Sequence, residues 1–221
     1  IDGSITNDSN SANIARDFVN TNGRSPLILN KENATINNIT GNFIANTSDG
    51  TSSWNGNGYD YIDGKVIDNN GHIDNIKGNF AINKTYNGLI YNNKNATIDK
   101  IEGLFVDNSG YAVSNSGIIK SILADFIKTD GINNDSGTIT NIVGDFINSR
   151  IHNYEGTIDK IEGTFTTAFI ENEKGTINNI KGNFIGNTKI ENSGSIDKIE
   201  GLFSTTNKFD SGSSYYHTDS Y

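Results

Sequence analysis

The 221-residue chain has no cysteine, no methionine and a single proline, and only six of its residues are leucine. Without cysteine it can form neither a disulfide scaffold nor a thiolate metal site. Acidic residues outnumber basic ones by 26 to 17, and this formal net charge of −9 argues against a nucleic-acid-binding face. No apolar run approaches the roughly 18 residues of a membrane-spanning helix. No signal segment is recognisable, and the missing initiator methionine predicts a processed or excised segment.

The abundant residues favour strands and turns. The chain contains 36 asparagines, 33 isoleucines and 24 glycines. Isoleucine suits the pleated, half-buried surface of a strand, whereas asparagine and glycine tolerate the positive φ angles of tight turns. Good helix formers such as leucine, alanine and glutamate are scarce. The composition therefore predicts an all-β fold.

One motif recurs along almost the whole chain: two isoleucines separated by two residues, then x-Gly-x-Phe. It reads INNITGNF over Ile36–Phe43 and IDKIEGTF over Ile158–Phe165, and from Phe146 onward the copies follow one another every 19 residues. If each copy occupies the same place in successive turns of a coil, its phenylalanine stacks on the one before. The predicted core ladder consists of Phe43, Phe80, Phe105, Phe126, Phe146, Phe165, Phe184 and Phe203.

A second signature precedes most copies: an apolar residue, any residue, then asparagine. Ile170-Glu171-Asn172 is an example, and the small turn residue Gly175 follows it. We predict that these asparagines form a ladder at one corner, where their amides can hydrogen-bond to each other and to the bend backbone. The predicted members are Asn69, Asn115, Asn134, Asn153, Asn172 and Asn192.

Three short strands per unit, joined by bends and turn residues, indicate one turn of a parallel β-solenoid. The spacing between the two isoleucines breaks the alternation of a strand, so we expect a bend between them. The prediction is a single-stranded parallel β-helix of about nine coils, each of about 19–25 residues. It forms one domain over 1–221, with the clearest repeats over 34–203, an inserted loop at 47–66, and a disordered or truncated tail at 208–221. A leucine-rich repeat has a similar period, but glycine fills its third apolar position here, as at Gly41.

The repeat also resembles a known family. The unit GTINNIKGNF at Gly175–Phe184 is similar to the passenger repeats of bacterial autotransporter-like surface proteins, commonly written G-T-I-x-x-I-x-G-D-F. Gly88–Asn92, GLIYN, resembles the G-A-I-Y-N segment that precedes them, and Asp125 and Asp145 keep the acidic residue. Over 34–203 the resemblance implies a right-handed β-helix that is exported and displayed at, or released from, the cell surface. The family's signal segment and membrane barrel are not recognisable, so we expect a passenger fragment or a related secreted protein.

Contacts with other molecules are expected from insertions, which project from a repeat scaffold as loops. The largest insertion contains the single tryptophan in a Gly/Ser/Asn-rich setting, which suits a sugar- or protein-binding surface. The tail has similar chemistry. The candidate contact residues are Trp54, Tyr59, Tyr61, Tyr215 and Tyr216.

Catalysis on a β-helix requires clustered carboxylates. One column after the first isoleucine carries Asp74, Asp99, Asp159 and Asp197, which we interpret as a solvated face and not a converging site. We therefore predict no catalytic residues.

A metal site is not expected either. Calcium could be bound through Asp60, Asp63, Asp68 and Asp74, but no calcium-loop spacing occurs. His72, His152 and His217 occupy different repeat positions, so we expect them to form no metal cluster. We predict no metal and no cofactor.

The sequence thus predicts a non-enzymatic, extracellular β-helical stalk or adhesin-like passenger of a bacterial surface or secreted protein. Its partners would be a host or self surface protein or a glycan, and no nucleic acid. One alternative is a self-assembling extracellular filament subunit, joined end to end through unpaired strand edges. A second is a polysaccharide-active β-helix enzyme.

Overall fold

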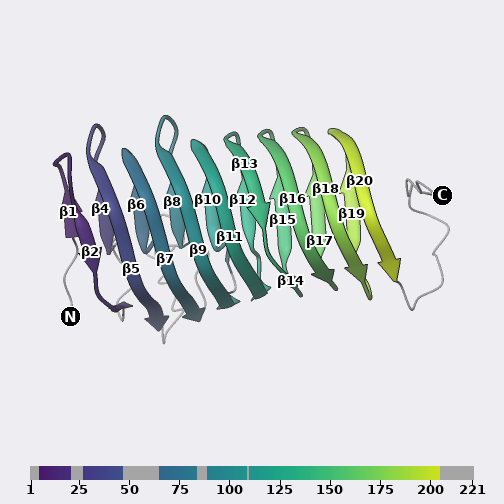
Figure 1. Cartoon of the computed structure of the whole chain (residues 1–221), viewed down its shortest axis with the longest axis horizontal. Coiled ribbons are helices and arrows are strands. Elements are labelled where there is room, and N and C mark those ends of the chain that lie inside the picture. The colour runs from purple at the N-terminus through teal and green to yellow at the C-terminus, as the bar shows by residue number, and fades with distance from the viewer. Residues whose placement is uncertain (1–4, 21–26, 47–64, 84–88, 109, 205–221) are drawn as a thin grey trace, which may run out of the picture.

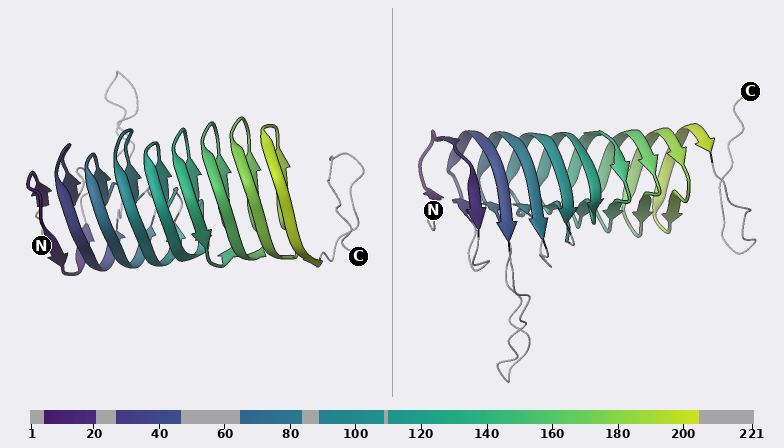
Figure 2. Two further views of the ribbon diagram at one scale, coloured as in Figure 1. Left: turned by 45° about the horizontal axis from the view of Figure 1, so that its top comes forward. Right: turned by 90° about the horizontal axis from the view of Figure 1, so that it is seen from below.

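The computed structural model describes residues 5–20, 27–46, 65–83, 89–108 and 110–204. In these residues the regular structure is β-strand throughout, and all strand pairs are parallel. Successive turns stack along one axis, with the first described segment, 5–20, and the last coil, 189–204, at opposite ends (Figures 1 and 2). The predicted parallel β-solenoid is confirmed. No helix in the described residues is long and apolar enough to cross a membrane.

Each coil contributes one short and one long strand, and like strands stack into two sheets, which Figure 1 shows behind one another. The short strands, in sheet order, are β1 (Ile5–Asn7), β4 (Ile28–Asn30), β6 (Ile67–Asn69), β8 (Ile90–Asn92), β10 (Val113–Asn115), β12 (Ile132–Asn134), β15 (Arg150–Asn153), β17 (Phe169–Asn172) and β19 (Lys189–Asn192). The long strands are β5 (Thr35–Asn46), β7 (His72–Asn83), β9 (Thr97–Asn108), β11 (Ile118–Thr129), β16 (Thr157–Thr166), β18 (Thr176–Ile185) and β20 (Ser195–Ser204). In two coils the long strand is interrupted, giving β2 (Asn13–Ala15) with β3 (Phe18–Asn20), and β13 (Thr138–Val143) with β14 (Phe146–Ile147).

The repeat motif lies on the long strands, and its expected division into separate strands is wrong. Ile36 and Ile39 are both fully buried although they are three residues apart, so the chain bends between them. The strand nevertheless continues: Ile36 pairs with Ile73, and the parallel register resumes at Asn38 with Asn75. Apart from the two coils with an interrupted long strand, each coil therefore contains two strands instead of three.

The phenylalanine ladder is confirmed. Along the rod, consecutive rings lie 4.5 to 5.4 Å apart between centroids and are nearly parallel, from Phe18 to Phe203. Phe18 thus extends the predicted set by one coil. Phe203 departs from the expected burial: it stacks 4.5 Å from Phe184 but is 56% exposed, because β20 is the last strand that the structure describes.

The asparagine ladder is also present and longer than predicted. The amide nitrogen of each asparagine donates to the amide oxygen of the asparagine in the next coil, over 2.7 to 2.9 Å. Each amide also donates to bend carbonyls, as Asn134 does to Gly137 (3.0 Å). The ladder therefore satisfies backbone groups that the corner would leave unpaired. Its members are Asn7, Asn30, Asn69, Asn92, Asn115, Asn134, Asn153, Asn172 and Asn192.

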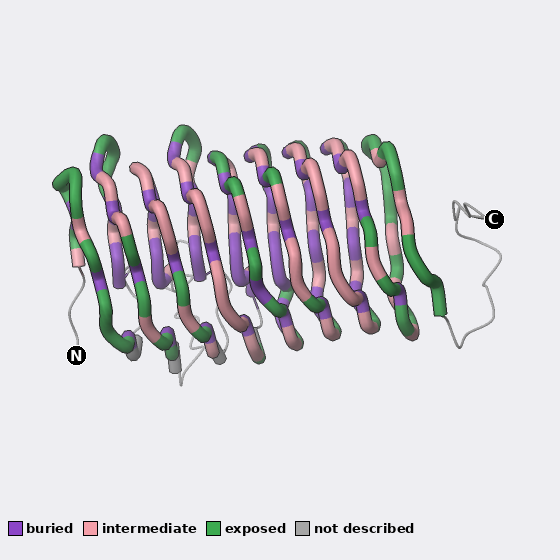
Figure 3. The backbone as a smooth tube through the Cα atoms, viewed as in Figure 1, coloured by how far each residue is buried: buried purple, intermediate pink, exposed green. Residues whose placement is uncertain are grey.

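The core is a continuous buried strip along the rod (Figure 3). Besides the motif residues it includes a column before the short strands, with Leu27, Val66, Leu89 and Ala112. Val66 is 1% exposed, so the last residue of the expected inserted loop is a core residue. Residues 47–64 of that loop lie outside the described part of the chain.

At most repeat glycines a side chain is disfavoured by the closeness of successive coils, although Ala124 fills the equivalent position on β11. A Cβ atom on Gly78 would lie 1.9 Å from the carbonyl oxygen of Gly41 and 3.1 Å from the Phe43 ring. The obstacle is therefore mainly the backbone of the preceding coil, and only secondarily the neighbouring ring.

Candidate functional site

Two corners of the rod project beyond the one between them (Figure 1). After the ladder asparagine, residues 31–34 connect β4 to β5 and residues 93–96 connect β8 to β9, whereas only residues 70–71 connect β6 to β7. The longer corners are stabilised by Asn33 and Asn95, which adopt left-handed φ angles of 63° and 68°. Asparagine is among the few residues that tolerate this conformation. The short corner is therefore the floor of a notch.

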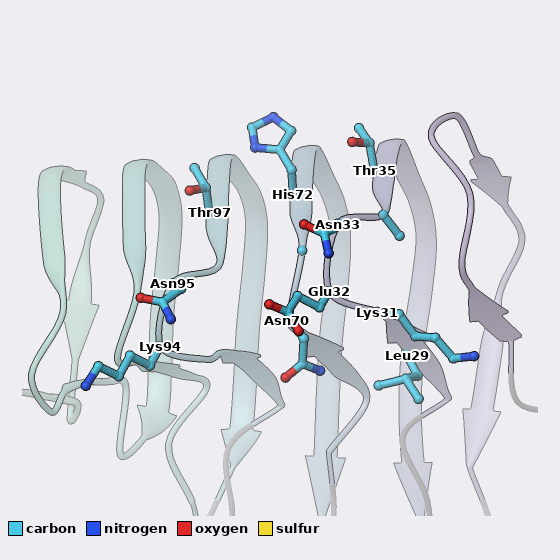
Figure 4. Close-up of a pocket in the computed structure, with 12 residues that line it drawn as sticks. Leu29, Lys31, Glu32, Asn33, Thr35, Asn70, His72, Lys94, Asn95 and Thr97 are labelled. Atoms are coloured by element: carbon cyan, nitrogen blue, oxygen red, sulfur yellow. The ribbon is translucent and has the colours of Figure 1, made fainter.

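The notch encloses about 760 Å³ and has mainly polar walls. Thr35, His72 and Thr97 stand in a row where β5, β7 and β9 begin, and they are register partners (Figure 4). The remaining lining side chains offer amides, ammonium groups and a carboxylate. They are Leu29, Lys31, Glu32, Asn33, Ala34, Asn70, Lys94 and Asn95. The notch therefore offers both hydrogen-bond donors and hydrogen-bond acceptors to a hydroxyl-rich ligand.

A first cluster of titratable groups adjoins the notch. His72 Nε2 lies 2.7 Å from Asp74 Oδ1 and 3.9 Å from Asp99 Oδ1. Lys120 Nζ lies 2.7 Å from the same Asp99 oxygen, and Asn37 donates to Asp74 over 3.0 Å. These contacts arise because equivalent residues of adjacent coils are stacked and His72 shares a strand face with Asp74.

A second cluster lies on the sheet of short strands. His152 on β15 is the register partner of Glu171 on β17, and Glu173 follows that strand. The imidazole Nε2 lies 3.2 Å from Glu173 Oε1 and 3.8 Å from Glu171 Oε2. Arg150 forms an ion pair with Glu171, and its guanidinium lies 5.3 Å from the centroid of the Phe169 ring.

The second cluster perturbs several protonation equilibria. Burial, with a smaller contribution from the Arg150 charge, lowers the pKa of His152, although the Glu173 hydrogen bond opposes this. Burial raises the pKa of Tyr111 and also the pKa of Asp130, and Arg150 opposes both increases. Shifts caused by burial next to specific charges are typical of functional sites, and also of structural ion-pair networks.

His72 and His152 thus each lie beside two carboxylates, which the sequence reasoning did not anticipate. The histidine, aspartate and glutamate atoms of each cluster lie within 4.8 Å of one another. Asp74 and Asp99 likewise converge on His72 instead of forming only a solvated face. The column of aspartates after the first isoleucine of the motif does indicate that Asp74 and Asp99 are neighbours. The residue between the apolar position and asparagine in the second signature forms a column that indicates the stacking of His152 on Glu171.

Within its described part, the structure brings no further candidate residues together. The contact candidates Trp54, Tyr59, Tyr61, Tyr215 and Tyr216 lie outside the described residues, as do Asp60, Asp63 and His217. Asp68 lies 3.7 Å from Lys65 and accepts a hydrogen bond from Asn93, apart from the His72 cluster. In the carboxylate column, Asp159 accepts a hydrogen bond from Asn178 over 3.0 Å.

Compared with known protein families, curated proteins and solved structures, the chain matches none.

Proposed function

We propose that the chain is a non-enzymatic, rod-like stalk of a bacterial surface or secreted protein, and that it makes adhesin-like contacts through its projecting corners. The observation that carries the proposal is a solenoid with one continuous core and a polar notch cut into one corner. The resemblance of its repeats to autotransporter passengers supports the extracellular setting.

The rod supplies stiffness because each coil is held to the next in three ways. Backbone ladders pair the strands, phenylalanines stack in the core and asparagine amides link the corners. A lone coil cannot bury its apolar side chains, so neighbouring coils stabilise each other. A rigid spacer of this kind can hold a contact site away from a cell surface.

The notch is suited to a glycan. Its volume of about 760 Å³ falls within the roughly 300–1,000 Å³ of small-ligand pockets. Its walls carry hydroxyl, amide, carboxylate and ammonium groups, which match the alternating donors and acceptors of sugar hydroxyls.

A glycan array probed with the purified chain tests this proposal, followed by affinity measurements on the retained glycan. Asn33→Gly removes a wall of the notch while keeping a residue that accepts the left-handed φ. We expect it to weaken binding at least tenfold. Asn148→Gly is the matched control, since Asn148 also has a positive φ (48°) but does not line the notch. Retention of no glycan, or equal loss in both variants, would contradict the proposal.

The two alternatives remain predictions with their own tests. Concentration-dependent polymers in electron micrographs would favour a filament subunit. Release of reducing or unsaturated sugars from acidic polysaccharides would favour an enzyme, and in that case His72→Gln and His152→Gln identify which cluster acts.

A further inference from the structure

The cluster around His152 has the arrangement of a metal-ligand set. Three groups from two adjacent coils converge: the imidazole of His152 and the carboxylates of Glu171 and Glu173. The His152 side chain is 13% exposed and that of Glu171 is 18% exposed, whereas Glu173 at 41% faces solvent. An ion held there would have one side open to water.

The distances between ligand atoms come close to those around a tetrahedral ion. Bonds of roughly 2.0–2.2 Å to nitrogen and oxygen keep the ligand atoms of such an ion about 3.3–3.6 Å apart. His152 Nε2 lies 3.2 Å from Glu173 Oε1 and 3.8 Å from Glu171 Oε2, on either side of that range. In the His72 cluster the corresponding distances are 2.7 and 3.9 Å, which lie further outside that range.

The other imidazole nitrogen is also oriented. Tyr111 Oη lies 3.4 Å from His152 Nδ1, and the two rings are 20° from parallel. The coil of β12 lies between the coil of β10, which Tyr111 precedes, and the coil of β15, which carries His152. Tyr111 therefore reaches His152 across one intervening coil, whose Gly131 accepts backbone hydrogen bonds from the residues that follow Tyr111. With a metal ion on Nε2, Nδ1 would carry the proton, and its N–H would donate a hydrogen bond to the tyrosine oxygen. Metal-ligating histidines are commonly held by such a partner on their second nitrogen.

We propose that His152, Glu171 and Glu173 bind one divalent transition-metal ion, with Tyr111 as a positioning residue and water completing the coordination. A nitrogen ligand beside two carboxylates suits zinc, whereas calcium and magnesium prefer an all-oxygen set. The ion would link the coils of β15 and β17 on the outer surface of the rod, independently of the notch.

Arg150 limits the affinity of this site and provides a signature for it. Its guanidinium pairs with Glu171, so it repels a cation and competes for that carboxylate. Removing the charge leaves Glu171 free to turn toward the ion. We therefore expect Arg150→Gln to bind zinc more tightly, by on the order of tenfold for one charge removed near a divalent ion in a largely solvated site.

The experiment is calorimetric titration of the metal-free chain with zinc, with cobalt absorption reporting coordination geometry. We expect one zinc per chain at this site, a tetrahedral cobalt spectrum, and much weaker binding of calcium and magnesium. His152→Gln and the more exposed Glu173→Gln should each weaken zinc binding by more than the roughly 10–100-fold cost of losing an outer partner. Tyr111→Phe should weaken it about tenfold while keeping the cobalt spectrum.

His72→Gln is the matched control, because it removes the histidine of the other cluster and should leave this affinity unchanged. Circular dichroism of each variant separates loss of ligand from loss of fold, and Glu173→Gln changes a solvent-facing side chain. No zinc binding by the wild-type chain at millimolar zinc would overturn the proposal. Binding that survives His152→Gln and Glu173→Gln but disappears with His72→Gln would overturn it as well, and so would calcium binding as tight as zinc.

Discussion

The asparagine ladder makes a sharp prediction at Asn134, which is fully buried. Its amide nitrogen donates to Asn153 Oδ1 over 2.8 Å, and its oxygen accepts from Asn115 Nδ2 over 2.9 Å. Substitution Asn134→Ala removes both bonds and also the bonds that this amide donates to the carbonyl oxygens of Gly137 and Thr157. One amide hydrogen of Asn115 and the amide oxygen of Asn153 then lose their ladder partner inside the corner.

The magnitude follows from those two groups. A buried polar group left without a partner costs roughly 1–3 kcal/mol, so the pair costs about 2–6 kcal/mol. This is a large part of the roughly 5–15 kcal/mol that stabilises a typical domain. The neighbouring residue is a matched control: Asn133 is half-buried on the same strand, and its Oδ1 accepts no hydrogen bond from the described residues. Asn133→Ala should therefore change stability by no more than about 0.5 kcal/mol.

Urea unfolding followed by circular dichroism measures both variants. Hydrogen exchange at the amides of β10, β12 and β15 then shows whether the loss is centred on the affected coils, as expected when each coil interacts only with its neighbours. If Asn134→Ala proves no more destabilising than Asn133→Ala, the ladder contributes nothing to stability and the reasoning fails.

Three further substitutions have definite expected outcomes. Phe165→Ala should cost about 3–5 kcal/mol in thermal unfolding, because it opens a cavity between two stacked rings, and an unchanged Tm would contradict the core assignment. Gly78→Ala should cost roughly 1–3 kcal/mol in urea unfolding, since its Cβ would meet the Gly41 carbonyl 1.9 Å away; wild-type stability would mean that the coils can separate freely. Lys160→Met breaks a surface ion pair of 2.8 Å with Glu162 and should lower the free energy of unfolding by less than about 1 kcal/mol. A larger loss in the same assay would show that this surface ion pair stabilises the rod more than expected.

Much of this fold could be predicted because stacking gives identical positions identical surroundings. The Ile-x-x-Ile-x-Gly-x-Phe motif identified the buried residues of the long strands. The apolar-x-Asn signature also fits Asn7, Asn30 and Asn92, which the prediction omitted in the part of the chain where irregular insertions obscure the repeat. The motif could not distinguish a bend inside a strand from a break between strands, because both place Ile36 and Ile39 inward.

The clusters on the surface were harder to predict. His152 and Glu171 meet because their columns align between coils, and this follows from register alone. Tyr111, however, reaches His152 from two coils away, and such a contact depends on side-chain length and on Gly131 in between. Sequence columns do not show contacts of that kind. The notch depends in the same way on the unequal lengths of three successive corners.

The regular spacing of the last coils has a consequence for how such a protein changes over generations. From Phe146 to Phe203 the motif isoleucines and phenylalanines of successive coils stack on their equivalents at a constant interval of 19 residues. Duplicating or deleting one whole coil in frame would reproduce contacts that already exist, and would alter the reach of the rod by about 4.8 Å. Insertion of one residue within a strand would instead turn inward side chains outward. The rod can therefore change in length by whole coils, whereas insertions of single residues within a strand are poorly tolerated.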